Sequence, residues 1–521
     1  MSRSQGRTRV VVVGAGIGGL VAALELAAQG LEVTLVERAA QPGGKMRQVQ
    51  SAGRPIDAGP TVFTMRWVFE ALFAAIGESL DEQLALQPLQ VLARHAWGPR
   101  EVLDLYADLE RTVAAITAFS SAAEGERYRR FSHRAQAIYR TLEQPFLRAG
   151  RPNVLSLAWR AGLRGLPGLL RISPLATMAG ELAREFKDPR LAQLFARYAT
   201  YCGSSPYQAP ATLMLVAHVE RAGVWSVQGG MHRLAQCLAG AAQRRGARLR
   251  YGVGAAEIVI ERGRTRGVVL DDGERLEADA VVFNGDAQAL AAGRLGAAAR
   301  AAVKARPRSA RSLSALTWSL CAPTAGFALG RHNVFFSSDY AAEFDALLQQ
   351  RRVPQQPTVY VCAQDRLDPS EAAHGRAERL LMLVNAPADG DRHPLDPKEL
   401  ASCQERTLSR LQHCGLTIQA PLADAVITQP ADFERLFPAT GGALYGPASH
   451  GWRASFQRPG ARSRVPGLYL AGGSTHPGPG VPMAALSGRQ AVASLLADCP
   501  RPRASTPPWP RAATPGGTST P

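Results

Sequence analysis

Three patterns that would define other classes of protein are missing from this sequence of 521 residues. The seven cysteines are an odd number and no Cys-x-x-Cys pair occurs, so we expect neither a disulfide framework nor a zinc site. No window contains the roughly 18 to 20 uninterrupted apolar residues of a membrane-spanning helix. An expected strand begins at Val10, which leaves no room for a secretory signal, so we expect a cytoplasmic protein.

Lysine is also scarce, since it occurs only at positions 45, 187, 304 and 398. Arginine therefore carries almost all of the formal net charge of +17. A basic surface suits anionic lipid and nucleic acid equally. Because no helix-turn-helix, RNP or zinc-finger pattern is present, we expect no nucleic-acid partner.

The clearest motif that is present begins with Val10–Val13, a run that predicts a fully buried strand of a parallel sheet. Gly14, Gly16 and Gly19 follow it with Gly-x-Gly-x-x-Gly spacing, ahead of an expected helix over 20–29. In this motif the first glycine makes a tight turn, the second lets a pyrophosphate approach the backbone, and the third lets the helix pack on the strand. The alternative is a purely structural Gly-rich turn.

Glu37 ends a second expected strand, over 31–36, and is placed to accept a hydrogen bond from an adenosine ribose. FAD and NAD share that fingerprint, so the choice depends on Gly43, Gly44 and Lys45. This extension is typical of flavoproteins of the amine-oxidase and carotene-desaturase type, in which the glycines allow close backbone approach and the cation meets the diphosphate. On its own the Gly-Gly pair is also consistent with a flexible turn.

A strand, a loop rich in glycine and proline, and a helix follow one another near the C-terminus. The loop contains Gly472 and Gly473 and leads to Pro482 and Met483 at the start of the helix. Backbone N–H groups at such a helix start can stabilise negative charge on the pyrimidine edge of a reduced flavin. His476 in the same loop is a weak candidate for catalysis, and a hydrogen bond that fixes the loop is its alternative role.

These patterns predict an α/β protein with an FAD-binding doubly wound, Rossmann-like domain, an antiparallel-sheet substrate domain and a helical membrane-associated region. We expect the strands over 253–261, 265–270 and 280–283 to rejoin the first sheet, and those over 312–320, 358–362 and 380–383 to form the second. The expected division is 8–66, 223–300 and 467–498 for FAD binding, 67–222 for the helical region, 301–466 for the substrate domain and 499–521 for a disordered tail.

Three segments resemble the bacterial carotenoid desaturases: Gly472–Pro482 resembles their C-terminal signature, Asp57–Thr61 their flavin-proximal segment, and Trp225–Met231 the segment before their second nucleotide-binding stretch. The similarity spans about Thr8 to Asp498. It implies FAD as the cofactor and an acyclic carotenoid as the substrate, and it implies cofactor contacts at Gly59, Pro60, Thr61 and the backbone near Ala255.

Within that family, Arg331–Phe336 and Thr358–Arg366 are most similar to the subgroup that desaturates the 3,4 bond of 1-hydroxycarotenoids. A terminal hydroxyl in an apolar tunnel needs a polar partner, because leaving it unpaired costs on the order of 1 to 3 kcal/mol. The candidates for that partner are His332, Asn333 and Gln364. The electron acceptor that reoxidises the flavin is left unassigned between a quinone, oxygen and another carrier.

The sequence contains no Ser/His/Asp set, and no carboxylate pair that can be assigned as acid and base. Desaturation beside a polyene can proceed without them, because the cofactor supplies the chemistry. The alternatives are a phytoene desaturase, an amine or protoporphyrinogen oxidase, and a non-enzymatic prenyl-lipid carrier of the same architecture.

A carotenoid lies in the hydrocarbon layer of a membrane, so we expect peripheral attachment to the inner or an intracytoplasmic membrane. The candidate segment is 154–182, where eight leucine and tryptophan positions alternate with Arg160, Arg164 and Arg171. An ordinary pair of core helices, interrupted at Pro167 and Pro174, is the other interpretation.

Overall fold

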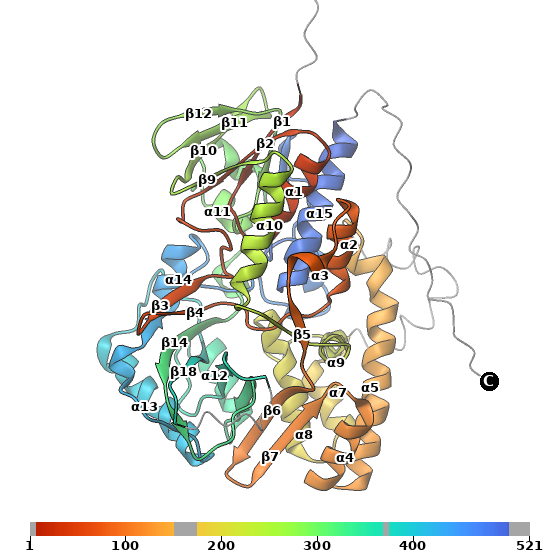
Figure 1. Ribbon diagram of the computed structural model, residues 1–521, viewed down its shortest axis with the longest axis vertical. Coiled ribbons are helices and arrows are strands. Elements are labelled where there is room, and N and C mark those ends of the chain that lie inside the picture. Colours follow the sequence, from red (N-terminus) through yellow and green to blue (C-terminus); the bar gives the residue numbers. More distant parts are fainter. Residues whose placement is uncertain (1–6, 151–174, 368–374, 500–521) are drawn as a thin grey trace, which may run out of the picture.

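The computed structural model describes residues 7–150, 175–367 and 375–499. Most of the expected membrane segment, residues 154–174, and the expected disordered tail from residue 500 lie outside the described residues. The chain forms two main sheets, one above the other in Figure 1, with helices packed beside both.

The upper sheet has five strands, all parallel, and is assembled from three separate stretches of the chain. In spatial order the strands are β21 (Leu468–Leu470), β13 (Ala280–Phe283), β1 (Arg9–Val13), β2 (Glu32–Glu37) and β9 (Arg248–Tyr251). The predicted α/β sheet is therefore confirmed, with the strand that begins the glycine motif at its centre.

Strand β1 is apolar without interruption because both faces of the sheet are covered. Val10 and Val12 pack with the helices on one face, whereas Val11 and Val13 pack against a small sheet and a short helix on the other. The helices of the first face are α1 (Ile17–Ala28), α2 (Trp67–Ala75), α10 (His232–Arg244) and α15 (Val481–Asp498), and α11 (Ala287–Ala291) lies on the second.

The small sheet corrects one expectation from the sequence. β10 (Ala255–Glu261) and β11 (Arg264–Leu270) do not join the parallel sheet, but form an antiparallel sheet of their own with β12 (Arg275–Glu277). The tight turn at Arg262 and Gly263 pairs β10 directly with β11, so both strands are taken up by local antiparallel pairing. Only β13 from this part of the chain joins β1.

The lower sheet has seven strands and is mostly antiparallel, as expected, with one parallel pair between β16 and β6. In spatial order the strands are β20 (Val426–Thr428), β14 (Ser314–Ala322), β18 (Glu378–Ala386), β17 (Val359–Ala363), β16 (His332–Phe335), β6 (Val91–Gly98) and β7 (Glu101–Tyr106).

Strands β6 and β7 correct a second expectation, because residues 67–222 were expected to be helical. They form a hairpin whose edge pairs with β16, more than 200 residues further along the chain. Leucine, alanine and arginine in this stretch favour helix locally, but the distant pairing partner decides the outcome. Small two-stranded sheets add β3 (Gln48–Ser51) with β4 (Arg54–Asp57), β5 (Leu86–Pro88) with β8 (Trp225–Val227), and β15 (Thr324–Ala325) with β19 (Thr417–Ile418).

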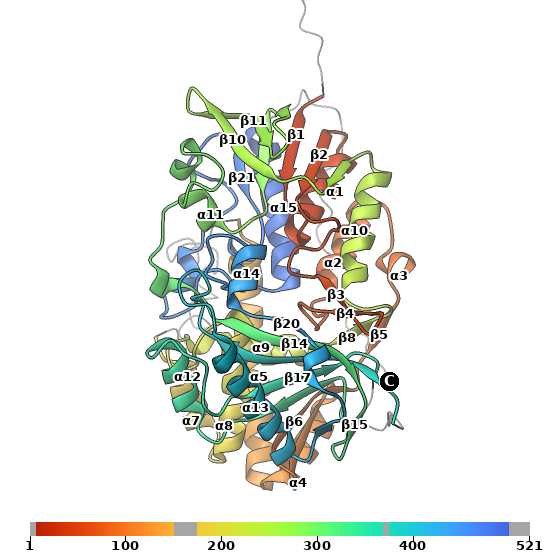
Figure 2. The same ribbon diagram turned by 90° about the vertical axis from the view of Figure 1, so that its left-hand side faces the viewer.

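The two faces of the lower sheet have different neighbours. Leu380, Met382 and Val384 on β18 pack in a core that also contains residues of α13 (Pro397–His413). The alternate residues Leu381 and Leu383 face an internal cavity instead. Figure 2 shows α13 crossing the outer face of this sheet.

A helical layer packs beside the lower sheet, with its own core around Phe131 and Phe195 (Figure 1). Its helices are α4 (Leu109–Phe119), α5 (Ala122–Leu142), α7 (Met178–Glu185), α8 (Pro189–Ala196) and α9 (Leu215–Arg221). The other α-helices of the described residues are α3 (Leu80–Gln83), α12 (Tyr340–Leu348) and α14 (Pro430–Leu436). Among the described residues, no helix combines the length and the apolar character needed to cross a membrane.

The two faces of β18 predict different effects of substitution. Replacing Met382 with alanine removes a fully buried side chain from the core, so we expect the free energy of unfolding to fall by about 2–5 kcal/mol. Leu383→Ala, one residue along and facing the cavity, is the matched control and should cost much less. Urea titration followed by circular dichroism measures both, and equal losses would contradict the assignment of the two faces.

Candidate active site

A cavity of about 890 Å³ lies between the two main sheets, within the range of about 300–1,000 Å³ usual for small-molecule sites. Its lining is mostly apolar and comes from both sheets and from the helical layer. The residues expected from sequence to bind the cofactor that do line it are Gly14, Gly16, Glu37, Gly44, Lys45, Gly59, Pro60, Thr61, Ala255, Gly472, Gly473, Pro482 and Met483. Gly19 and His476 do not.

Glu37 is fixed at the edge of the cavity by two backbone donors. Its Oε2 accepts a hydrogen bond from Ala15 N at 2.7 Å and its Oε1 accepts one from Ala39 N at 2.9 Å. Gly14, directly after β1, has a φ of +99° and donates from its backbone N–H to the carbonyl of Val36, the residue before Glu37, at 2.8 Å. The carboxylate is therefore held in place before any ligand arrives.

The glycine loop packs against Asn284, a residue that the sequence did not indicate. A Cβ on Gly16 would lie 2.7 Å from Asn284 Nδ2, and a Cβ on Gly19 would lie 2.1 Å from the carbonyl oxygen of Gly14. Asn284 Nδ2 also donates to that carbonyl at 3.2 Å. Gly19 thus serves helix packing, as expected of the third glycine, and stands behind the cavity wall.

The second glycine pair packs on the first loop. Gly43 N donates to the carbonyl of Ala15 at 2.8 Å, and a Cβ on Gly44 would lie 3.1 Å from the Cα of Gly16. Gly59 is equally confined, because a Cβ there would lie 1.9 Å from the carbonyl oxygen of Lys45. These contacts bring the two glycine motifs and the 57–61 segment to one wall of the cavity.

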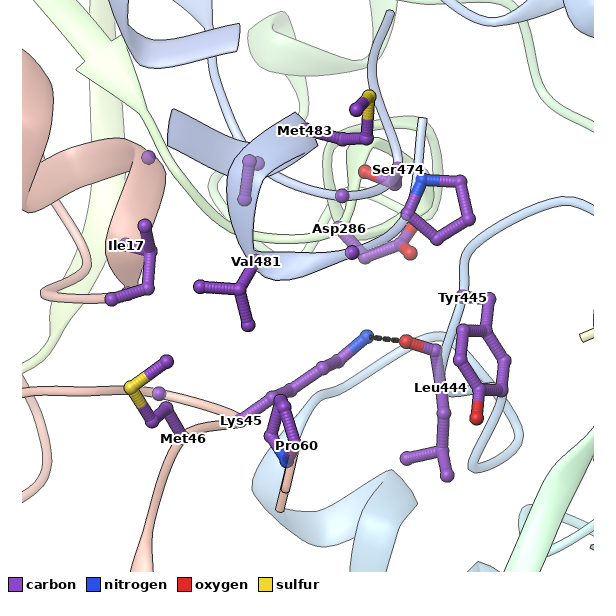
Figure 3. Close-up of a pocket in the computed structure, with 18 of the residues that line it drawn as sticks. Ile17, Lys45, Met46, Pro60, Asp286, Leu444, Tyr445, Ser474, Val481 and Met483 are labelled. Atoms are coloured by element: carbon purple, nitrogen blue, oxygen red, sulfur yellow. Dashed lines mark hydrogen bonds between the residues drawn. The ribbon is translucent and has the colours of Figure 1, made fainter. Parts of the chain in front are cut away.

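Two helices begin at the cavity. The N-caps of α1 and α15 are Gly16 and Gly480; neither helix has a capping side chain or an acidic residue in its first turn. The unpaired N–H groups and the helix dipole of such ends favour an anion. Ile17 and Val481, at the two starts, approach the same space in Figure 3. A dinucleotide with two phosphates fits this arrangement.

Two cations line the cavity, the partly buried Lys45 and the buried Arg458. Lys45 crosses the cavity and donates from Nζ to the carbonyl of Leu444 at 2.6 Å (Figure 3), and burial lowers the pKa of this amine. Arg458 donates to the carbonyls of Tyr445 and Gly473 at 3.1 Å each and to that of Pro447 at 2.6 Å. Burial lowers the pKa of Arg458 to about 10, so the guanidinium stays charged at neutral pH.

His476 is buried outside the cavity lining, and its contacts are with the helical layer. Its Nε2 lies 2.9 Å from the carbonyl oxygen of Phe146, and its ring meets the Phe146 ring edge-on at 4.9 Å. Burial lowers its pKa to about 4, so the ring is neutral at physiological pH. This geometry matches the loop-fixing alternative, and we propose no catalytic role for His476.

None of the three residues expected to bind a substrate hydroxyl lines the cavity among the described residues. Asn333 bonds to the backbone of Gly330 and Val361, and Gln364 bonds to both the backbone N–H and the carbonyl of Asp57. His332 reaches the cavity only indirectly, since its Nδ1 lies 2.7 Å from the hydroxyl of the lining residue Tyr360.

Comparison with known proteins gives a consistent result. The family model described as flavin containing amine oxidoreductase matches residues 17–496. Hydroxyneurosporene desaturase from Rubrivivax gelatinosus is 57% identical over 94% of this chain and 93% of its own length, and that from Cereibacter sphaeroides is 46% identical over 94% and 98%. Cyclohexylamine oxidase from Brevibacterium oxydans has a similar fold, with a TM-score of 0.54 and 18% identity over 95% of this chain and all of that one.

The contacts of Gly16 predict that a larger side chain at this position prevents binding of the cofactor. Gly16→Val places a side chain against Asn284 and into the path of the pyrophosphate, so we expect the purified variant to lose most of its flavin. Gly240→Val on α10 is the control, because a Cβ there meets only Arg244 Nη1, at 3.6 Å. The ratio of flavin to protein absorbance is the measurement, and full flavin content in Gly16→Val would refute this role of the loop.

Proposed function

This chain belongs to the flavin-containing amine oxidoreductase family, and on that premise we propose that it is an FAD-dependent carotenoid desaturase. It introduces a 3,4 double bond into acyclic 1-hydroxy or 1-methoxy carotenoids such as hydroxyneurosporene. The observation that carries this proposal is the extent of identity to the hydroxyneurosporene desaturases, which covers nearly the full length of both chains. The apolar cavity beside the glycine loop supports it.

Each wall of the cavity has a part in holding FAD. Glu37 would accept a hydrogen bond from the adenosine ribose, and the start of α1 would hold the diphosphate. The 58–61 segment and the start of α15 would hold the flavin between them, and the N–H groups of that helix start would favour negative charge at the pyrimidine edge. When bound, FAD supplies the acceptor for a hydride from the substrate.

In this reaction the protein binds the substrate, aligns it with the cofactor and excludes water from the site. Leu213, Leu215, Val216, Leu381 and Leu383 present an apolar surface to the polyene and exclude water from it. A rod-shaped substrate held against this surface has one C–C bond beside the cofactor, which turns the reaction into a positioned unimolecular step.

The proton lost with the hydride does not require a strong base. Loss of hydride beside a polyene leaves a positive charge that is delocalised along the conjugated chain, so water or a weak base can take the proton. Glu220 is a carboxyl group in the cavity lining, and burial raises its pKa. Its two oxygens accept hydrogen bonds from Tyr198 and Tyr201, so we do not assign it as the base.

We also propose that the protein attaches peripherally to the cytoplasmic face of the inner or an intracytoplasmic membrane. The largest exposed apolar side chains of the described residues are Leu175, Tyr207 and Trp452, with exposed fractions of 77%, 42% and 37%. Trp452 also lines the cavity, and Arg453 stacks on its ring at 4.8 Å. Tryptophan, tyrosine and arginine are the residues that favour the interface of an anionic membrane.

Backbone hydrogen bonds join the segments that carry these three side chains. Ala211 N donates to Ala176 O at 2.9 Å, and Gly451 N donates to Gln208 O at 2.8 Å. The three side chains therefore belong to one surface region beside the cavity. Leu175 is the first described residue of the expected membrane segment, whereas Met178 and Leu182, further along it, are buried in the helical core.

The proposed function predicts a choice between two substrates. FAD-loaded protein should convert hydroxyneurosporene to a product with one more conjugated double bond at the 3,4 position and leave phytoene unchanged. Chromatography with absorbance detection separates the products. Conversion of phytoene alone would instead indicate a phytoene desaturase, and conversion of neither would remove the desaturase proposal.

If the exposed patch of Leu175, Tyr207 and Trp452 attaches the protein to the membrane, polar substitutions in it should weaken binding to lipid vesicles. Leu175→Ser with Trp452→Ser should reduce co-flotation with vesicles that contain anionic lipid by about tenfold, because two apolar contacts with the bilayer are removed. The control is Leu348→Ser on α12, a partly buried leucine outside the patch. Flotation equal to wild type by a folded double variant would exclude the patch as the attachment site.

A further inference from the structure

Besides the polar residues of the glycine-loop wall, the cavity lining contains a group of five polar side chains that are linked by contacts among themselves. Arg197, Tyr201 and Glu220 come from the helical layer, whereas Tyr360 comes from β17 and Thr61 from the segment after β4. All five line the cavity. A buried polar group in an apolar wall is costly unless it is paired, so each of these side chains needs a partner.

Four of the five are paired with one another or with a neighbour. Glu220 accepts from the hydroxyl of Tyr201 at 3.1 Å. The hydroxyl of Tyr360 lies 2.7 Å from Thr61 Oγ1 and also 2.7 Å from Nδ1 of His332. Burial lowers the pKa of His332 to about 3, so that ring is neutral.

Arg197 is paired less completely than the other four. Its guanidinium lies over the rings of Tyr201 and Tyr360, with its carbon 5.7 and 5.4 Å from their centroids, and it interacts with the Tyr201 hydroxyl. Among the described residues no carboxylate oxygen lies within the 4.0 Å of an ion pair, and the guanidinium makes no hydrogen bond to a backbone carbonyl. A guanidinium has five N–H donors, so donors remain for an oxygen in the cavity.

The position of this cation matches the chemistry of the proposed substrate. The group includes Thr61, which lies in the segment that we place beside the flavin and contacts the hydroxyl of Tyr360. In a 1-hydroxycarotenoid only C2 separates the oxygen-bearing C1 from C3, so the oxygen lies close to the bond that reacts. A donor that holds the oxygen therefore has to stand near the flavin as well.

The geometry points to a specificity site: Arg197, supported by Tyr360 and Thr61, donates a hydrogen bond to the terminal oxygen of the carotenoid and thereby sets which bond lies beside the flavin. This inference rests on the proposed function and adds the residue that selects the substrate. Because arginine only donates, an ether oxygen satisfies it as well as a hydroxyl. The site therefore accepts 1-hydroxy and 1-methoxy carotenoids and disfavours a terminus without oxygen.

The test compares FAD-loaded wild type with Arg197→Met, which keeps an unbranched apolar stem and removes the donors. With hydroxyneurosporene we expect KM to rise about 10- to 100-fold, since a hydrogen bond to a charged group is lost. With neurosporene, which lacks the oxygen, we expect KM to stay the same or fall. Arg197→Lys should restore part of the preference, and Arg233→Met, on the exposed surface of α10, should change nothing.

Tyr360→Phe provides a second and milder variant, which removes one hydroxyl from the polar group and should weaken the preference severalfold. Flavin absorbance and the thermal midpoint are measured for each variant, so that loss of fold is not taken for loss of specificity. If folded Arg197→Met keeps the wild-type ratio of kcat/KM for the two substrates, the inference is wrong.

Failure of the proposed function has a different signature, namely a wild-type protein that converts neither carotenoid. In that case the shift of polyene absorbance on binding to the FAD-loaded protein still compares hydroxyneurosporene with neurosporene. Tighter binding of hydroxyneurosporene that is lost in Arg197→Met supports the specificity site without the reaction. Equal binding of both carotenoids overturns it.

Discussion

The site depends on one close approach, between the side chain of Asn284 and the first glycine loop. A Cβ on Gly18 would lie 2.7 Å from Asn284 Oδ1 and 2.8 Å from the backbone nitrogen of Gly472. Three segments that are far apart in the sequence therefore meet with no room for a side chain between them. The cofactor wall exists only when the first strand, the middle of the chain and the C-terminal loop have all assembled, so its formation is as non-local as that of any part of the fold.

The sequence predicted what depends on neighbours along the chain. Val10–Val13 and the glycine spacing specify a strand and a turn through local geometry, and both are found as expected. Glu37 ends the next strand, also as expected. The expectation of helix was wrong for β6 and β7, because their strand structure depends on pairing between β6 and the distant strand β16. The domain boundaries and the cofactor contacts of individual residues stay predictions.

The side chains that the sequence missed share one property, which is that their role arises from distant neighbours. Asn284 directly follows the buried strand β13, and a polar residue at the carboxyl end of a parallel strand was a usable signal. Arg197 carried no such signal, because arginine is common throughout this chain and its placement over Tyr360, far along the chain, comes from the tertiary fold. His332 was named from the sequence, but it lies behind the cavity lining and contacts the lining residue Tyr360.

The alternation along β18 has a consequence for how such a protein diversifies. Since even-numbered positions such as Met382 support the core and odd-numbered ones such as Leu383 form the cavity wall, a substitution in one set leaves the contacts of the other set in place. The lining can drift towards a longer, shorter or more oxidised polyene while the supporting layer stays unchanged. A single inserted residue would exchange the two roles, so this strand tolerates substitution far better than a change of length.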